Sequence, residues 1–357
     1  MALIQTTILI FTFFSFFIGQ IFRLNLFDTS FPLIDIAIML LALVNILQHI
    51  KQNNLKPNNK YFLYFLIFTW FFLFINLFKY QIISLKPIFY LIRLTCLLSL
   101  FIFPINIKNK LKNLFIIFVI ANIIFGIIQY FVWPDFTYFN ISNWDPHLYR
   151  LVSTYFDPTF TALIYLFLVI KLFLEKDFKY RKPLLIISYL AMALTYSRST
   201  YLSFLVAFIF IAISQKKIKI FLYSIFIILL TIMLLPRQQG EGTKLERTSS
   251  IFAKMENYQE GFSLFIKSPL VGHGYNNLSF LRNSNSNSHA ISGFDGSLLT
   301  ILVTTGIIGF SFFILGINRF FYQSSLLKKS MMISLLVHSI FANSFLYPWV
   351  LLSFILF

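Results

Sequence analysis

Long apolar runs dominate this sequence and constrain what it can fold into. A helix needs about 20 apolar residues to cross the hydrocarbon core of a bilayer, and about 17 suffice. About twelve such runs follow one another, at 2–22, 32–48, 61–78, 87–105, 114–133, 158–174, 183–197, 199–214, 219–236, 296–316, 330–345 and 346–357. The alternating pattern of a membrane barrel is absent from them. We therefore expect an all-α polytopic membrane protein with about 12 transmembrane helices, folded as a single integral membrane domain over residues 1–357.

The formal net charge of +17 could indicate a nucleic-acid partner, but the distribution of the basic residues favours a membrane protein. Lysines and arginines follow the second, fourth, sixth, eighth and tenth apolar runs, whereas the other loops mix signs or are acidic. Basic loops stay on the cytoplasmic side. The pattern predicts a multi-pass protein with both termini in the cytoplasm and no nucleic-acid partner. The single cysteine, Cys96, excludes a disulfide within the chain.

Residues 237–295 form the one long polar segment, and the charge pattern predicts that it lies outside the cytoplasm, over an active site. Within it, apolar side chains from Ile251 to Ile266 recur at helical spacing, with polar residues on the other face and Ser268-Pro269 at the end. This pattern predicts an amphipathic helix that lies on the membrane surface or packs over the transmembrane helices.

Three arginines on the predicted outer side are candidates for binding an anion. Arg198 stands between two apolar runs with almost no loop around it, Arg150 precedes another run, and Arg247 opens the amphipathic helix. Arg150 and Arg198 could instead be snorkelling interfacial arginines. A charge held at membrane depth usually faces a cavity or a partner. The planar guanidinium suits phosphate oxygens, so the three together favour a lipid-linked sugar with a diphosphate head.

Asp295 and His289, at the outer end of the run 296–316, are candidate acid/base residues. A lone histidine in a polar loop is more often inert. The sequence shows no cluster of metal-ligand spacing and no nearby pair of aspartates of the kind that a magnesium-dependent phosphotransferase needs, so we expect no metal and no cofactor.

Four segments resemble the O-antigen polymerase and O-antigen ligase superfamily of bacterial inner-membrane proteins. Residues 150–158 (RLVSTYFDP) are similar to its Arg-x-x-Gly-Thr-Phe-x-(Asp/Asn)-Pro segment, with Ser153 in place of the glycine. Residues 194–199 (LTYSRS) resemble Leu-Thr-x-Ser-Arg-Gly, and 268–274 (SPLVGHG) resemble Asp-x-Pro-Leu-x-Gly-x-Gly. Residues 295–309 resemble a His-Asn-x-x-Leu segment that leads to Gly-(Leu/Ile)-(Ile/Leu)-Gly.

The resemblance implies a metal-independent glycosyltransferase of the bacterial inner membrane that uses an undecaprenyl-diphosphate-linked oligosaccharide. It implies that Arg198, Arg247 and, less directly, Arg150 act on the diphosphate. Ligases of the family have a histidine where counting back from Gly306 places Asp295. This departure favours a polymerase, which adds the growing glycan to the next lipid-linked repeat unit and has a flippase and a chain-length regulator as possible partners.

Two alternatives remain open at this point. A ligase would move the glycan onto lipid A core and would leave long lipid-linked chains when lost, whereas loss of a polymerase would leave single repeat units. A flippase or transporter would carry ionisable residues along a path through the membrane. Only Asp35 and Arg93 lie deep in the predicted runs, which argues against transport.

Overall fold

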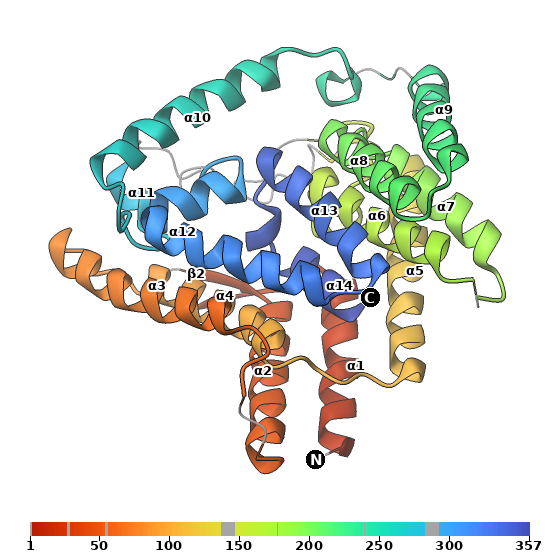
Figure 1. The fold of residues 1–357 in the computed structure, drawn as a ribbon. Helices are drawn as coiled ribbons and strands as arrows, with labels where there is room; N and C mark the ends of the chain where they lie inside the picture. The colour runs from red at the N-terminus through yellow and green to blue at the C-terminus, as the bar shows by residue number, and fades with distance from the viewer. Residues whose placement is uncertain are drawn as a thin grey trace. The chain divides into compact units, whose positions relative to one another are not determined.

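The computed structural model describes residues 2–26, 29–53, 56–136, 147–176, 178–236, 238, 240–282 and 293–357. These residues form fourteen α-helices and a pair of short antiparallel strands, so the chain is mostly helical (Figure 1). The strands, β1 (Arg23–Leu26) and β2 (Thr29–Pro32), are the departure from the all-α prediction. With four residues each between apolar runs, they are too short to leave a recognisable alternation.

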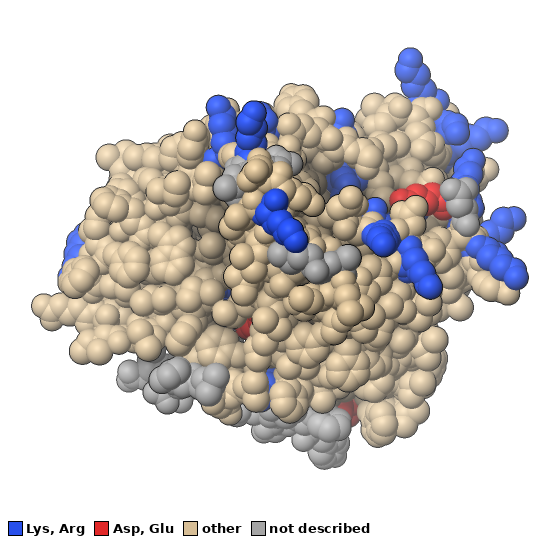
Figure 2. All heavy atoms as spheres, turned by 90° about the horizontal axis from the view of Figure 1, so that it is seen from below, with Lys and Arg blue, Asp and Glu red and all other residues tan. Residues whose placement is uncertain are grey.

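Each of the twelve predicted apolar runs coincides with a helix. Among the described residues, four helices are long and apolar enough to cross a membrane by length and composition: α2 (Leu33–Lys51), α3 (Lys60–Lys79), α5 (Asn109–Val132) and α12 (Ser297–Gln323). Shorter apolar helices occur at Leu3–Ile18, Pro158–Leu174, Arg198–Ser214 and Ile218–Leu234. The helical, membrane-type fold is therefore confirmed, whereas the count of twelve spans and the orientation remain predictions. Figure 2 shows one face, on which blue Lys and Arg side chains are prominent and little red from Asp and Glu is visible.

The chain divides into two compact units, and the expectation of one domain over the whole chain remains a prediction. Unit 1 comprises Met1–Leu111 and Ile251–Gln323. Its helices are α1 (Ala2–Ile18), α2 (Leu33–Lys51), α3 (Lys60–Lys79), α4 (Lys86–Ile102), most of α10 (Ser249–Lys267), α11 (Leu278–Leu281) and α12 (Ser297–Gln323).

In unit 1, α12 packs along α3, and α2 packs between α1 and α4 (Figure 1). Asn59 caps α3 and also donates its side-chain amide to the Gly316 carbonyl of α12, at 2.7 Å. Asp35 and Arg93 face each other, with 3.3 Å between a carboxylate oxygen and Nε. The two deep ionisable residues thus neutralise each other, which is how buried charges are usually accommodated.

Unit 2 comprises Lys112–Ser250 and Ser324–Phe357. Its helices are α5 (Asn109–Val132), α6 (Pro158–Leu174), α7 (Arg181–Ala193), α8 (Arg198–Ser214), α9 (Ile218–Leu234), α13 (Leu326–Phe341) and α14 (Pro348–Leu356). Helix α6 is buried along most of its length and contacts α7, α8, α13 and α14, while α8 also packs against α9 and α13. Its continuous apolar sequence is what a helix surrounded by neighbours requires.

The predicted amphipathic helix is present as α10 and ends just before Ser268-Pro269, as expected. Tyr258, Leu264 and Phe265 pack against a buried cluster of Leu278, Phe294, Leu299 and Val303, while Phe252 and Ile266 are exposed. Only part of the apolar stripe is used for packing within unit 1. The position of segment 237–295 relative to the membrane stays a prediction.

Candidate functional site

The turn between α7 and α8 places Arg198. The chain reverses over four residues, and Tyr196 adopts a left-handed conformation with φ 54°. The Thr195 hydroxyl donates to the Met192 carbonyl at 2.7 Å and accepts from the Ser197 amide at 3.3 Å. These hydroxyls satisfy backbone groups that the turn leaves unpaired. The turn is therefore rigid, and Arg198 becomes the first residue of α8.

Arg150 is held on the same turn. Its Nε donates to the Thr195 carbonyl at 2.8 Å, and the next amide, of Leu151, donates to the Leu194 carbonyl at 3.0 Å. From α5, the Gln129 side-chain carbonyl accepts from the Val152 amide at 3.0 Å. Arg150 is only 7% exposed. This arginine is built into the unit and is not a snorkelling side chain at the surface.

A glycine-flanked loop, Gly240-Glu241-Gly242, packs over the Arg150 segment. A Cβ on Gly242 would stand 2.7 Å from the Arg150 Cδ, and one on Gly240 would stand 3.3 Å from the Leu148 carbonyl oxygen. Only glycine allows this close approach, and Gly240 also has φ 151°. The sequence carried this signal, two glycines around a charged residue, but it was not recognised as part of the site.

Arg198 joins that loop to the start of α10. One terminal nitrogen, Nη1, donates to the carbonyls of Leu245 and Arg247, at 3.1 and 2.8 Å, and Nη2 donates to Ser250 Oγ at 2.6 Å. The Arg247 guanidinium turns back to the carbonyls of Gly242 and Lys244. Among the described residues, neither Arg198 nor Arg247 forms an ion pair with a carboxylate. The structure therefore brings the three predicted arginines together in unit 2.

The neighbouring positive charges disfavour the charged forms of Arg150 and Arg247. Burial and then the charge of Arg247 lower the pKa of Arg150 to about 10, although Asp157 acts in the opposite direction. Burial and then Arg198 lower the pKa of Arg247. Like charges that disfavour each other's protonated form are stabilised when an anion arrives. The arrangement thus favours binding of a multiply charged anion such as a diphosphate.

The charges of Arg150 and Arg247 also act on the imidazole of His147. Burial, followed by the charges of Arg150 and Arg247, lowers its pKa to about 3. Its backbone is fixed by a bond from the Phe136 amide to the His147 carbonyl, at 2.9 Å. The imidazole is neutral at physiological pH and can accept a hydrogen bond. Sequence reasoning did not select this residue, because nothing local distinguishes it from an inert loop histidine.

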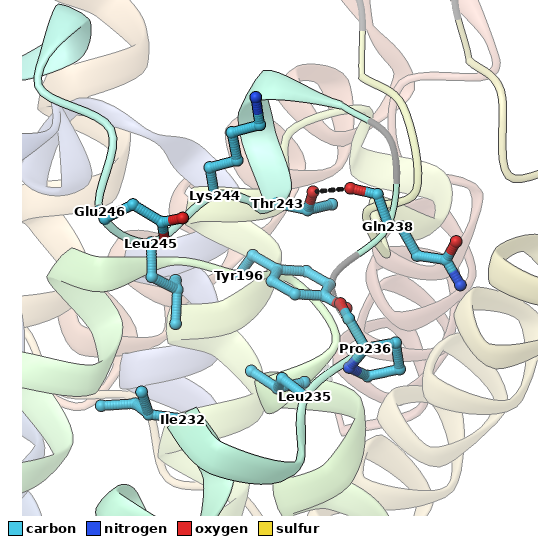
Figure 3. A pocket seen from close by; sticks show the side chains of 9 residues that line it. All are labelled: Tyr196, Ile232, Leu235, Pro236, Gln238, Thr243, Lys244, Leu245 and Glu246. Carbon is cyan, nitrogen blue, oxygen red and sulfur yellow. Dashed lines mark hydrogen bonds between the residues drawn. The ribbon is translucent and has the colours of Figure 1, made fainter.

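A cavity of about 220 Å³ lies between the end of α9 and the segment that holds Arg198 (Figure 3). Ile232, Leu235 and Pro236 form an apolar side, and the Tyr196 hydroxyl donates to the Pro236 carbonyl at 2.7 Å. The Glu246 side chain is directed toward the cavity. The volume is below the range of pockets that enclose drug-sized ligands. It can therefore take only part of a large substrate.

The segment that resembles Pro-Leu-x-Gly-x-Gly has a structural role in unit 1. Helix α12 is broken at Gly306, which has φ 63° and ψ −174°. The amides of Ile307 and Ile308 donate to the carbonyls of Pro269 and Leu270, at 2.8 and 3.2 Å. In return, the carbonyls of Val303 and Thr304 accept from the amides of His273 and Gly274, at 3.2 and 2.9 Å. Residues 269–274 thus replace the hydrogen bonds that the break removes.

Of the two predicted acid/base residues, the structure describes Asp295 alone. Asp295 lies in unit 1, where a carboxylate oxygen is 3.2 Å from Lys254 Nζ and its amide donates to Asn257 Oδ1 at 2.8 Å. His289 lies outside the described residues. Their roles remain predictions. No group of three or more metal-ligand side chains occurs among the residues that the structure describes.

Comparison with known families supports the resemblance found in the sequence. Residues 183–314 match the family model described as O-antigen ligase, a stretch from α7 into α12 that includes Arg198 and Arg247. No curated protein matches the chain. The resemblance to the O-antigen polymerase and ligase superfamily, whose members are membrane enzymes that transfer glycans, is thereby confirmed over these residues.

Proposed function

We propose that this protein is a polysaccharide polymerase that transfers a growing glycan from undecaprenyl diphosphate onto the next lipid-linked repeat unit. The observation that carries the proposal is the cluster of Arg150, Arg198 and Arg247 in unit 2. Two of these side chains are positioned by backbone carbonyls and lack a carboxylate partner among the described residues. Such a preorganised set of donors is suited to a group that carries two phosphates.

In this reaction the acceptor hydroxyl attacks the first carbon of the donor glycan, and the bond from that carbon to the diphosphate breaks. The electron pair of that bond goes to the diphosphate oxygen. Fixed guanidinium groups stabilise this developing charge without reorganising, which is where electrostatic catalysis is most effective. The developing negative charge would also offset the positive field that lowers the pKa of Arg150 and of Arg247. No metal ion is required to balance the leaving group.

The cavity beside Arg198 supplies a place for part of a sugar next to the diphosphate. Its apolar side suits the carbon face of a ring, and its polar side, with Gln238, Thr243 and Glu246, suits hydroxyl groups. We assign to it the sugar adjacent to the diphosphate.

A ligase is the second candidate, since the matching family model is described by that activity. The two differ in the acceptor: a lipid-linked repeat unit for a polymerase, lipid A core for a ligase. Deleting the gene in its own bacterium separates them. Accumulation of single lipid-linked repeat units supports the polymerase, and accumulation of long lipid-linked chains supports the ligase and overturns our assignment.

The diphosphate role is tested with Arg198→Ala and Arg247→Ala, purified in lipid nanodiscs. Each is expected to slow transfer from undecaprenyl-diphosphate-linked repeat units by about 100- to 1000-fold, the loss typical of one donor to a developing oxyanion. Arg181→Ala is the matched control, because its guanidinium also donates to backbone carbonyls, Leu172 and Phe173, in the same unit. Normal rates in either test variant, with the protein folded, would remove the role assigned to that arginine.

A further inference from the structure

A chain of hydroxyl and imidazole groups begins beside Arg198 and runs into the interior of unit 2. Ser199 Oγ lies 3.2 Å from His338 Nε2, and the other ring nitrogen, Nδ1, lies 2.5 Å from Ser344 Oγ. The partners come from α8, from α13 and from the short turn Ser344–Leu346. Ser197 Oγ, which is itself buried, lies 3.2 Å from Ser199 Oγ.

These hydroxyls differ from the other serines of the same helices. Ser203 in α8 donates to the Ser199 carbonyl, and Ser339 in α13 donates to the Leu335 carbonyl, each four residues back. Helical serines normally bond in this way. Ser199 and Ser344 instead contact the two ring nitrogens of one histidine. The contact therefore needs an explanation other than local helix geometry.

The exposed fractions show which end of this series of side chains a substrate can reach. His338 and Ser344 are both 0% exposed, whereas Ser199, one residue after Arg198, is only partly buried. A serine hydroxyl within reach of a histidine that is itself oriented by a third group is the arrangement that activates hydroxyl groups in enzymes. The accessible end of this arrangement is on the residue next to the arginine to which we assign the diphosphate.

We propose that Ser199 and His338 form the proton-accepting pair of the arginine cluster. This inference rests on the proposed glycosyl transfer. As the acceptor oxygen forms its bond to the glycan, its proton passes to Ser199 Oγ, and the Ser199 proton passes to His338 Nε2. The electron pair of the broken bond leaves with the diphosphate. The imidazolium is stabilised by its Nδ1–H bond to Ser344. Because His338 is fully buried, its proton returns through Ser199 Oγ and leaves from there to solvent before the next turnover.

The pair lies within the same compact unit as the three arginines, whereas Asp295 lies in the other unit. In the segment that resembles Leu-Thr-x-Ser-Arg-Gly, Ser199 stands where the family pattern has glycine. The hydroxyl is thus a feature of this sequence and not of the family pattern. This sequence also has Asp295 at the position where ligases of the family have a histidine.

The test measures kcat and KM for the lipid-linked donor, together with equilibrium binding of undecaprenyl diphosphate, in nanodiscs. Ser199→Ala and His338→Gln are each expected to lower kcat about 100-fold or more, the usual contribution of a positioned base, with KM and binding unchanged. The double variant should lose no more than either single variant, because the two residues act as one unit. Ser199→Thr, which keeps the hydroxyl, should restore most of kcat.

Ser203→Ala and Ser339→Ala are the matched controls and should retain normal kcat. Ser344→Ala keeps His338 and its contact with Ser199, so it tests the pair even if the histidine variant fails to fold. It should lower kcat about 10-fold. Unchanged kcat in Ser199→Ala, or losses that add in the double variant, would overturn the pair. Loss of undecaprenyl diphosphate binding only in Arg198→Ala supports the proposed function independently, and normal binding there would overturn it instead.

Discussion

The arginine cluster of unit 2 and the break in helix α12 of unit 1 both occur where the backbone is irregular. The two regions satisfy their polar groups differently. At Gly306, backbone amides and carbonyls of residues 269–274 pair with those of α12, so the polar groups are matched within the chain. Around Arg198, backbone carbonyls position guanidinium groups, and the neighbouring positive charges disfavour the charged forms of Arg150 and Arg247. The first region needs nothing from outside to be stable, whereas the second has excess charge that an anionic ligand can balance.

The comparison predicts that changes at the broken helix lower stability more than changes at the arginines. Gly306→Ala should lower the free energy of unfolding by about 3 kcal/mol, because φ is positive and a Cβ would stand 2.3 Å from the Leu270 carbonyl oxygen. The measurement is the thermal unfolding midpoint in detergent. Gly261→Ala in α10 is the control, since Gly261 does not have a positive φ and the nearest atoms to its Cβ would belong to the Leu299 side chain rather than to backbone. Equal losses in both would contradict the role of Gly306.

A substitution in the arginine cluster should raise the free energy of unfolding, whereas one at the broken helix lowers it. Arg247→Gln is expected to raise the free energy of unfolding by about 1 kcal/mol while it slows transfer, because the change removes a partly buried charge that disfavours its neighbours. Undecaprenyl diphosphate should raise the unfolding midpoint of the wild type more than that of the variant. If the variant is less stable without ligand and gains as much from it, the charge repulsion inferred here is not significant.

The sequence predicts the helices better than it predicts the contacts between them. Apolar runs located all twelve segments, since burial and lipid exposure both select such residues, and the spacing of Ile251 to Ile266 located α10. The resemblance and the expected outer topology selected the three arginines that unit 2 brings together. Local patterns carry this information.

Contacts between distant segments left no such pattern. Ser199 and His338 are 139 residues apart and meet only because α8 packs against α13. The pairing of residues 269–274 with α12 likewise depends on two glycines that allow close backbone approach: Gly272 lies against Thr304 and Thr305, and Gly306 lies against Leu270 and Val271. Each residue alone is ordinary for its helix or turn, so single-sequence reasoning could name these glycines as part of a resemblance but could not assign their partners.

The smallest expected effect concerns Ser153, where the superfamily pattern has glycine. Its φ of 53° costs a residue with a side chain about 1 kcal/mol, whereas its hydroxyl recovers a similar amount by donating to the Asn122 carbonyl at 2.9 Å. Ser153→Gly should therefore change stability by less than about 0.5 kcal/mol, because it exchanges one term for the other. Ser153→Ala keeps the strain and loses the bond, and it should be about 1 kcal/mol less stable than the glycine variant. Unfolding midpoints of the two variants measure this difference; equal midpoints would mean that the left-handed conformation imposes no strain, and that the glycine of the pattern serves close packing against Gly126 instead.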